Sequence, residues 1–301
     1  EMVTAAALVR GGARHLLAFG AHEHPVAVQL GGADPAELAR AARIAEDEGY
    51  DEVNLNVGCP SDRVQSGCFG AALMRRPALV ADCVAEMGAA TCLPVTVKCR
   101  IGVDAQDPGE VLPRFLAGLR AAGVRRVTIH ARKAWLQGLS PKQNREVPPL
   151  DYPLVHAMKR AFPDMHVSIN GGLASLDAAL AELAPGRDGV ALDGAMIGRA
   201  AYQRPADILR SADSRIFGAG DPCAEPEEAV AAMRPYIAAE LARGTRLHAI
   251  TRHMLGLFAG RPGARGWRRV LGEGAVRPGA GLDVLDAALA EVAAGRAHAA
   301  E

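Results

Sequence analysis

Short apolar segments rich in β-branched residues recur along the first two thirds of the chain. They cover residues 26–30, 52–57, 94–99, 125–130, 165–170 and 189–197. Ala-rich segments with the apolar spacing of helices lie between them, for example at residues 35–48, 77–90 and 109–122. This alternation of strand and helix patterns is typical of βαβ units, so it predicts a parallel sheet covered by helices.

The number of these units indicates a barrel. A closed barrel of eight units needs about 250 residues, and the chain has 301 residues, half of them hydrophobic. Six strands are clear, and residues 1–4 have the pattern of the end of another strand, so the chain begins in the middle of a unit. We therefore predict an α/β fold, a (β/α)8 TIM barrel that lacks its first strand because the chain is truncated at its N-terminus. An open sheet is the alternative.

The pattern changes after about residue 218. The segment FGAGDPCAEPEE that follows is rich in Gly and Pro, as linkers are. Beyond it lie helical patterns only, at residues 225–243, 246–258, 263–273 and 281–295. The sequence therefore predicts two domains, a barrel domain over residues 1–218 and a small all-α helical domain over residues 219–301.

Charge is distributed unevenly, although Lys plus Arg and Asp plus Glu balance at 34 each. Residues 234–277 contain nine arginines and the two acids Glu240 and Glu273, a local excess of seven positive charges. A solvated helix face is the alternative explanation, but such faces usually mix both signs of charge. The excess therefore favours a surface that binds a polyanion.

Composition also bears on location and on metal binding. No segment has the length and apolar character of a membrane-spanning helix, and no secretory signal segment opens the chain. We therefore expect a cytoplasmic protein without membrane contacts. The six cysteines include no C-x-x-C pair and no cysteine and histidine cluster with zinc spacing. Reduced thiols and no metal site are expected.

The segment NLNVGCPSD places two asparagines in a strand and a cysteine just after it. Strand side chains alternate between faces, so Asn54 and Asn56 lie opposite the apolar side chains at positions 53, 55 and 57. A purely structural strand of a parallel sheet would be apolar on both faces. The pattern thus indicates the floor and rim of a polar pocket at Cys59, with a small buried thiol as the alternative.

Polar residues end every clear strand but the last. They are Gln29, Asn56 with Cys59, Lys98 with Arg100, His130 with Arg132, and Asn170-Gly171-Gly172. Functional residues of a parallel barrel lie at these carboxyl ends. The last strand runs into Gly198-Arg199, and two glycine turns with an arginine are suited to hold a phosphate. For each residue alone, a lysine lying along apolar surface or a histidine bonded within the core remains the alternative.

Five segments resemble one family: NLNVGCPSDRVQSGCFGAAL, VTVKCRIG, TIHARKAWLQGLSPKQNREVPPLDY, SINGGL and ITRHMLGLFAGRPGARGWRRVLGE. They are similar to segments of the bacterial tRNA-dihydrouridine synthases, most of all those of the A-type branch, and the resemblance runs over nearly the whole chain. It implies an FMN-dependent TIM barrel followed by a helical tRNA-binding domain, with NADPH or NADH as the reductant. The uridine reduced in that family lies in the tRNA D-loop, and the A-type branch is associated with positions 20 and 20a.

The resemblance also implies roles for individual residues. Cys59 would be the proton donor, while Gln29, Lys98 and His130 would contact the flavin. The flavin phosphate would be held by Asn170, Gly171, Gly172, Gly198 and Arg199. Asn56 and Arg100 would face the uracil, and the candidates for other tRNA contacts are Lys142, Arg145, Arg265 and Arg268.

The implied reaction fits a cysteine as the acid. Reduction of the C5=C6 bond of uracil needs a hydride, which a reduced flavin can supply to C6, and a proton at C5. Cysteine thiols have an ordinary pKa of about 8.5 and are mostly protonated at neutral pH. Cys59 therefore needs no partner base for this role, and Lys98 would stabilise negative charge on the reduced ring.

Three other functions remain open from the sequence. An FMN barrel that acts on a free pyrimidine or on orotate shares the flavin residues and the cysteine acid, but it gives no reason for the arginine-rich segment. A catalytically silent RNA-binding or chaperone protein fits the absence of a first strand. A flavin-free barrel enzyme for a sugar phosphate fits the phosphate site alone. In the implied function the chain acts on tRNA as a monomer.

Overall fold

The computed structural model describes residues 2–61, 67–186 and 189–300. The chain divides into two compact units. Unit 1 consists of Glu1–Gly172 and Ala181–Met196, and unit 2 consists of Leu173–Leu180 and Ile197–Glu301. The predicted domain boundary between residues 218 and 219 lies within unit 2, and the assignment of a domain to each side of it stays a prediction.

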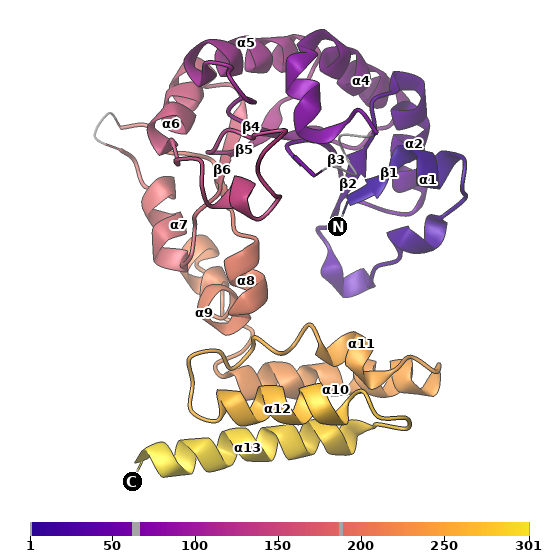
Figure 1. Cartoon of the computed structure of the whole chain (residues 1–301), viewed down its shortest axis with the longest axis vertical. Coiled ribbons are helices and arrows are strands. Elements are labelled where there is room, and N and C mark those ends of the chain that lie inside the picture. Colours follow the sequence, from indigo (N-terminus) through magenta and orange to yellow (C-terminus); the bar gives the residue numbers. More distant parts are fainter. Residues whose placement is uncertain (1, 62–66, 187–188, 301) are drawn as a thin grey trace. The chain divides into compact units, whose positions relative to one another are not determined.

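Unit 1 is built on a parallel sheet whose strands follow one another in chain order (Figure 1). Over the described residues the strands are β1 (Met2–Thr4), β2 (Ala27–Gly31), β3 (Glu52–Val57), β4 (Val95–Arg100), β5 (Arg126–His130), β6 (His166–Asn170) and β7 (Gly194–Met196). Each strand pairs in parallel with the next one along the chain. This is the arrangement of a (β/α)8 barrel over seven of its eight strands, so the predicted fold class is confirmed.

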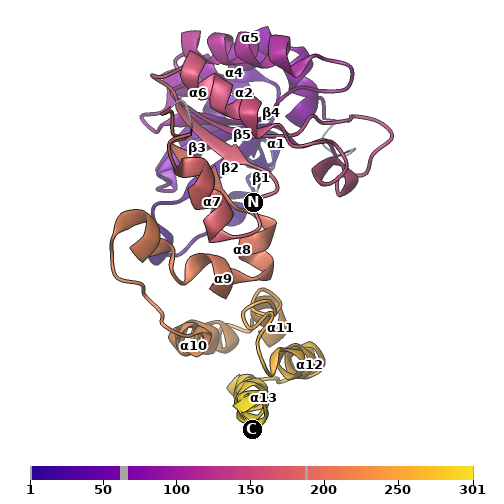
Figure 2. The same ribbon diagram turned by 90° about the vertical axis from the view of Figure 1, so that its left-hand side faces the viewer.

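Helices alternate with the strands of unit 1. They are α1 (Ala5–Val9), α2 (Pro35–Asp47), α4 (Pro77–Ala90), α5 (Pro108–Ala121), α6 (Tyr152–Ala161) and α7 (Leu176–Leu183), the last divided between the two units. Short 3-10 helices lie in the loops: η1 (Arg14–Leu17), η2 (Ala21–Glu23), η3 (Gly70–Arg75) and η4 (Gln143–Arg145). Figures 1 and 2 show α2, α4, α5 and α6 on the outer side of the strands.

Aspartates define where three of these helices begin. The side chain of Asp34 accepts a hydrogen bond from the backbone N–H of Glu37, and Asp107 and Asp151 cap α5 and α6 in the same way. A proline lies in the first turn of each helix, where its missing N–H costs no hydrogen bond. The helices predicted to begin at residues 35 and 109 correspond to α2 and α5, and the predicted and observed starts agree within one residue.

The predicted strand over residues 189–197 is wrong in its extent. Only Gly194–Met196 pair with β6, and residues 187–188 lie outside the described residues. The backbone N–H of Asp193 donates to the carbonyl of Val167 at 3.1 Å, and the Asp193 carboxylate accepts from the Val167 N–H at 2.8 Å. Because a side chain takes the place of a backbone carbonyl here, regular pairing begins one residue later.

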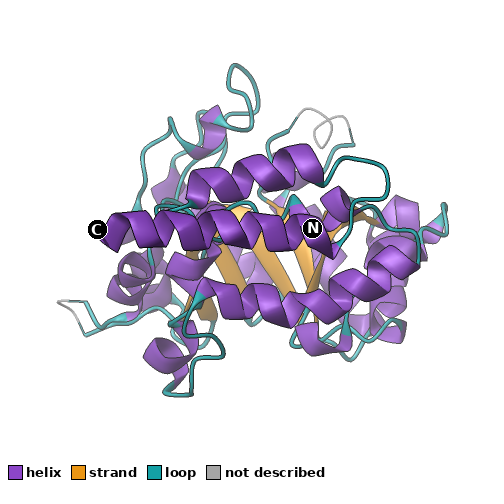
Figure 3. Cartoon of the chain, turned by 90° about the horizontal axis from the view of Figure 1, so that it is seen from below, coloured by secondary structure: helices purple, strands orange, loops and turns teal. Residues whose placement is uncertain are grey.

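Unit 2 consists of helices and loops over its described residues (Figure 3). The elements after β7 are α8 (Arg199–Gln203), α9 (Pro205–Leu209), the π-helix η5 (Asp213–Phe217), α10 (Pro226–Ala242), α11 (Leu247–Thr251), α12 (Ala264–Gly274) and α13 (Leu282–Ala300). The predicted succession of helices at the C-terminal end is therefore confirmed.

One predicted helix of this region, over residues 246–258, is wrong in its extent. Only Leu247–Thr251 are α-helical, and the residues after them form successive turns with bonds to the third residue back, such as Leu257 N–H to the Met254 carbonyl at 3.0 Å. A Cβ on Gly256 would lie 2.2 Å from the carbonyl oxygen of Gln203. The close approach of another backbone requires glycine here, and glycine weakens a helix.

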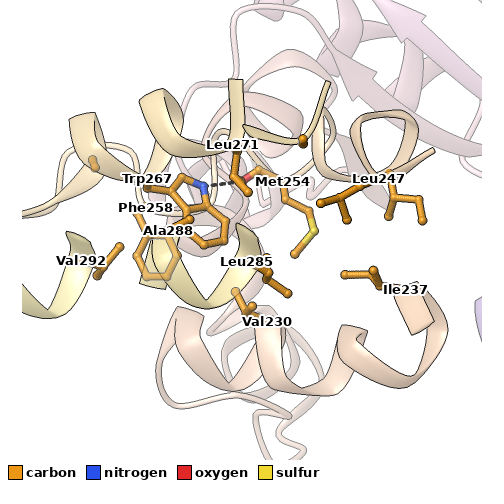
Figure 4. Packing of buried hydrophobic residues seen from close by; sticks show 13 residues of the cluster. Val230, Ile237, Leu247, Met254, Phe258, Trp267, Leu271, Leu285, Ala288 and Val292 are labelled. Carbon is orange, nitrogen blue, oxygen red and sulfur yellow. Dashed lines mark hydrogen bonds between the residues drawn. The ribbon is translucent and has the colours of Figure 1, made fainter. Parts of the chain in front are cut away.

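The core of unit 2 is centred on Trp267 (Figure 4). This side chain is fully buried, and its indole N–H donates to the carbonyl oxygen of Met254 at 3.1 Å. The centres of the Trp267 and Phe258 rings lie 4.8 Å apart, and the rings are arranged edge to face. Further buried members come from α10 and α13: Val230, Ile237, Leu285, Ala288 and Val292. The apolar faces of these helices therefore share one core.

Three further observations concern membrane-spanning helices, cysteines and metal sites. No helix in the described part combines the length and apolar character needed to span a membrane. All six cysteines are free thiols. Across residues 2–61, 67–186 and 189–300, no group of three or more His, Cys, Asp or Glu side chains is arranged to hold a metal ion.

Candidate active site

Polar residues gather at the carboxyl ends of neighbouring strands in unit 1. Asn56 of β3 pairs in register with Lys98 of β4. Arg100, at the end of β4, pairs with His130 of β5, which in turn pairs with Asn170 of β6. Side chains opposite each other in a parallel sheet project from the same face. The sheet therefore brings these five predicted site residues together.

Amide side chains join strands β2 and β3 on the same face. The Nε2 atom of Gln29 donates to Oδ1 of Asn54, and Nδ2 of Asn56 donates to Oε1 of Gln29, both at 2.7 Å. Asn54 donates in turn to Oγ1 of Thr96 on β4 at 2.8 Å. Asn54 and Asn56 are buried, and their hydrogen bonds offset the cost of removing the two amides from water. Gln29, predicted to contact the flavin, is thus also part of a structural network.

Cys59 lies two residues beyond β3, in a turn that Asn56 holds. The Oδ1 atom of Asn56 accepts hydrogen bonds from the backbone N–H groups of Gly58 and Cys59, each at 3.0 Å. The carbonyl oxygen of Cys59 accepts from the backbone N–H of Ala71 in η3 at 2.9 Å. The Cys59 sulfur lies 3.4 Å from Oγ of Ser61. These bonds fix the backbone of Cys59, while the residue remains partly exposed.

Arg100 connects this turn to the loop that follows β5. It is 4% exposed, and its guanidinium donates to backbone carbonyls. Its Nε donates to the carbonyl oxygen of Gly58 at 3.1 Å, and its Nη1 donates to those of Asn144 at 3.0 Å and Lys133 at 3.3 Å. A buried cation with this many bonds is a structural connection between the three segments.

Lys98 and Arg100 place positive charge near Cys59. Burial, reinforced by the charge of Arg100, lowers the pKa of Lys98 from 10.5 to about 8. Burial also lowers the pKa of Arg100 to about 10, so that Arg100 stays charged at neutral pH. An ionised Cys59 favours the charged form of both residues. The Lys98 amine forms no hydrogen bond or ion pair with another described residue, so it is suited to an anionic or electron-rich ligand.

A glycine turn follows β6 and lies against His130. Gly171 and Gly172 have φ values of +106° and +73°, which favour glycine. A Cβ on Gly171 would lie 3.0 Å from Cε1 of His130, so the imidazole lies directly against this backbone. The hydroxyl of Tyr152 donates to the carbonyl oxygen of Gly171 at 2.6 Å. His130 is 7% exposed, and the turn and the imidazole together form one polar surface.

The predicted phosphate contacts divide between the two units. The Nδ2 atom of Asn170, at the end of β6, donates to the carbonyl oxygen of Met196 in β7 at 2.8 Å. The chain then enters unit 2, where Gly198 precedes α8 and Arg199 is its first residue. A joint role of Asn170, Gly198 and Arg199 in holding a phosphate stays a prediction.

The predicted tRNA contacts of unit 1 lie at η4. Lys142 is exposed and precedes η4, and Arg145 is half-buried at its end. Neither side chain forms an ion pair with a carboxylate in the described part of the chain. The Nε atom of Arg145 is buried and finds no partner among the described residues. Both side chains are therefore available to bind an anionic ligand.

The nine arginines of residues 234–277 fall into two groups. Four form ion pairs with carboxylates at 2.5–3.3 Å: Arg234, Arg243, Arg261 and Arg269. The other five form no ion pair with a described carboxylate: Arg246, Arg252, Arg265, Arg268 and Arg277. Arg265 and Arg268, the predicted tRNA contacts on α12, are exposed members of this second group. Basic and acidic residues are nearly equal in number over unit 2 as a whole, so the second group reflects an uneven distribution of charge within it.

Two residues that organise the site were not predicted from the sequence. Asn144 is fully buried, and its amide bonds both backbone groups of Trp135. Tyr152 fixes the carbonyl of Gly171. Asn144 lies in a polar loop segment, where no local pattern distinguishes a buried amide from a solvated one. Tyr152 follows the helix-capping Asp151, which indicates a helix start but no contact with the turn after β6.

Comparison with known proteins identifies the family of this chain. A family model described as dihydrouridine synthase matches residues 1–293. The tRNA-dihydrouridine(20/20a) synthase of Escherichia coli K12 is 55% identical over 294 residues, which cover 97% of this chain and 83% of that protein. The enzyme of the same name from Vibrio cholerae serotype O1 is 53% identical over 293 residues, covering 97% and 87%. That of Salmonella typhimurium is 54% identical over 294 residues, covering 97% and 86%. The chain therefore belongs to the dihydrouridine synthase family.

Proposed function

We propose that this chain is a tRNA-dihydrouridine synthase, an FMN-dependent oxidoreductase that reduces a uridine of the tRNA D-loop, at position 20 or 20a, with NADPH as the reductant. The names of the relatives support the substrate and the reaction. The observation that carries the proposal is the partly exposed Cys59, held by Asn56 near the cations Lys98 and Arg100. A cytoplasmic location and action as a monomer complete the proposal.

The polar residues of unit 1 fit a flavin nucleotide. Lys98 offers a partly buried amine without a carboxylate partner, and His130 offers an imidazole packed against the Gly171 backbone. These groups suit the polar edge of a flavin ring, and the glycine turn permits close approach of backbone N–H groups to an anion. When bound, reduced FMN supplies the hydride that adds to C6 of uracil.

Cys59 is the residue that we propose to protonate C5 of the uracil. Because Asn56 and Ala71 hold the backbone of Cys59 on both sides, its thiol is attached to a fixed point at the end of β3. The nearby cations Lys98 and Arg100 favour the negative charge that develops on the uracil during reduction. Removal of the thiol is therefore expected to stop proton transfer while leaving the binding groups in place.

A uridine within folded tRNA has to leave its stack to reach the ends of the strands, which costs a few kcal/mol. Contacts between basic residues and phosphates elsewhere on the RNA offset this cost without reading its sequence. Lys142 and Arg145 in unit 1, and Arg265 and Arg268 in unit 2, form no ion pair with a described carboxylate. They are our candidates for these phosphate contacts.

The proposed function is tested by the mass of the RNA product. Unmodified tRNA incubated with the protein, FMN and NADPH is expected to gain two hydrogens at a single uridine, located by mass spectrometry of nuclease fragments. Cys59→Ala is expected to bind tRNA normally in a filter assay but to form product about 100- to 10,000-fold more slowly. Free uridine monophosphate serves as the control and is expected to stay unchanged. Reduction of the mononucleotide but not of tRNA would contradict the proposal.

A further inference from the structure

Trp135 lies in the loop between β5 and η4, and its backbone is held on both sides. The side-chain oxygen of Asn144 accepts from the Trp135 N–H at 2.7 Å, and the Asn144 amide donates to the Trp135 carbonyl at 2.8 Å. The next residue, Leu136, donates its N–H to the carboxylate of Asp104 at 2.8 Å. Trp135 itself is nevertheless 42% exposed, whereas Asn144 is fully buried. An exposed aromatic ring thus stands on a fixed backbone.

The same buried residues connect Trp135 to the turn that carries Cys59. The carbonyl oxygen of Asn144 accepts from Nη1 of Arg100 at 3.0 Å. Nε of the same guanidinium donates to the carbonyl oxygen of Gly58, the residue before Cys59, at 3.1 Å. Two buried residues, Asn144 and Arg100, therefore link the backbone of Trp135 to the turn that carries Cys59, all within unit 1.

The surroundings of Trp135 are basic. The Lys133 amine lies 5.7 Å from the centre of the Trp135 ring, within the range of a cation–π contact. Lys142 and Arg145, on the same loop, form no ion pair with a described carboxylate. A flat aromatic surface among unbalanced cations is complementary to RNA, which offers flat bases and negative phosphates. An acidic protein surface would pair with the cations, but unpaired RNA offers both the negative charge and a flat base at every nucleotide.

We propose that Trp135 is a stacking surface for an unpaired base of the tRNA beside the target uridine. This inference rests on the proposed function, because it names a further contact with that RNA. When the target uridine leaves its stack, a neighbouring base loses a stacking partner, and the indole ring takes its place. Because the Trp135 backbone is already fixed by Asn144, little conformational freedom is lost when the base binds.

Tryptophan fluorescence of the wild-type protein tests the proposal, with Trp135→Phe as its control. The chain has two tryptophans, and the other one, Trp267, is fully buried in unit 2. Titration of the FMN-loaded protein with unmodified tRNA, in the absence of NADPH, is expected to quench the exposed tryptophan. Trp135→Phe is expected to abolish the quenching. Filter binding under the same conditions measures the affinity for tRNA independently.

Substitutions at Trp135 separate stacking from other roles. Trp135→Ala is expected to weaken tRNA binding about 10- to 100-fold, as base stacking predicts, while Trp135→Phe retains most of the affinity because it keeps a stacking ring. Phe217→Ala is the matched control, because Phe217 is an aromatic residue of unit 2 that is 75% exposed. It is expected to leave binding unchanged.

The outcomes distinguish this inference from the proposed function. Unchanged fluorescence of the wild-type protein while tRNA binds in the filter assay would overturn the role of Trp135 and leave the proposed function intact. Wild-type affinity in Trp135→Ala would also overturn it. Absence of any tRNA binding by the wild-type protein would overturn the proposed function and, with it, the inference that rests on it.

Discussion

The side-chain oxygen of Asn56 lies 3.0 Å from the backbone nitrogen of Cys59 and accepts its hydrogen bond. The same oxygen also accepts from Gly58 at 3.0 Å, so one amide satisfies two backbone donors of the Cys59 turn. Asn54 projects from the same face of β3, but its amide bonds Gln29 and Thr96 instead. Both asparagines join β3 to β2 through Gln29, but only Asn56 also holds the backbone of the Cys59 turn.

Asn56→Ala is expected to lower kcat with tRNA about 10- to 100-fold, because the Cys59 backbone loses its acceptor and the thiol moves. The buried N–H of Gly58 is left unpaired, so the free energy of unfolding should also fall by about 1–3 kcal/mol. Asn54→Ala is the matched control, expected to lose stability to a similar extent with little change in kcat. Equal effects of the two substitutions on kcat, at equal flavin content, would contradict a positioning role for Asn56.

Lys98 is expected to make flavin binding depend on pH. Its pKa in the folded protein is about 8, and an anionic or electron-rich ligand needs its protonated form. The affinity of the flavin-free protein for FMN is therefore expected to fall as pH rises through about 8, measured by quenching of flavin fluorescence. Lys98→Met should bind FMN more weakly at neutral pH and lose this pH dependence. If the affinity of Lys98→Met for FMN fell with pH as it does in the wild type, another group would be responsible for the pH dependence.

The same lowered pKa affects the stability of the flavin-free protein. Between about pH 8 and the unfolded value of 10.5, Lys98 is protonated in the unfolded chain but mostly neutral in the folded one. The unfolded state then binds more protons, so this residue's contribution to stability rises with pH across that window. Urea unfolding at several pH values should show a smaller rise for Lys98→Met than for the wild type.

The two groups of arginines in unit 2 predict different effects on RNA binding. The double variant Arg265→Ala with Arg268→Ala is expected to weaken tRNA binding and to reduce the slope of log affinity against log salt by about two. The double variant Arg243→Ala with Arg269→Ala removes the same net charge from residues that already pair with Glu240 and Glu291. Its salt slope is expected to change much less. Equal slopes for both double variants would show that net charge alone, and not ion pairing, governs the interaction.

Trp267 is expected to dominate the stability of unit 2. Trp267→Ala removes a fully buried ring and should lower the free energy of unfolding by about 3–5 kcal/mol. Trp267→Phe keeps most of the volume and removes only the indole donor, since the Met254 carbonyl still accepts from the Leu257 N–H. A smaller loss of about 0.5–1.5 kcal/mol is therefore expected. Urea unfolding followed by circular dichroism measures both, with Phe217→Ala as an exposed control. A wild-type midpoint in Trp267→Ala would contradict the packing in Figure 4.

Much of the fold follows from local patterns. The alternation of apolar and polar residues in β3, and the Asp-Pro start of α2, determine those elements from a few neighbouring positions. The early end of α11, the helix over Leu247–Thr251, does not follow from local patterns. It depends on the approach of the Gln203 backbone to Gly256, a contact between segments far apart in the sequence.

The candidate site shows the same division. That Lys98, Arg100 and His130 lie together follows from the rule that parallel strands present their carboxyl ends at one edge. The bonds of Arg100 do not follow from any rule of this kind, because its carbonyl partners at Gly58 and Asn144 come from two distant loops. The resemblance implies that Arg100 faces the uracil, and this contact stays a prediction beside the structural role that its bonds reveal.

In the proposed function, a bound flavin and Cys59 together reduce a uridine of tRNA. The most direct measurement is the visible absorption of the FMN-loaded protein, reduced with NADPH without oxygen and then mixed with unmodified tRNA in a stopped-flow instrument. We expect tRNA to restore the oxidised flavin band rapidly in the wild type and about 100- to 10,000-fold more slowly in Cys59→Ala. A reduced flavin that tRNA fails to oxidise, or equal rates in the two proteins, would contradict this account.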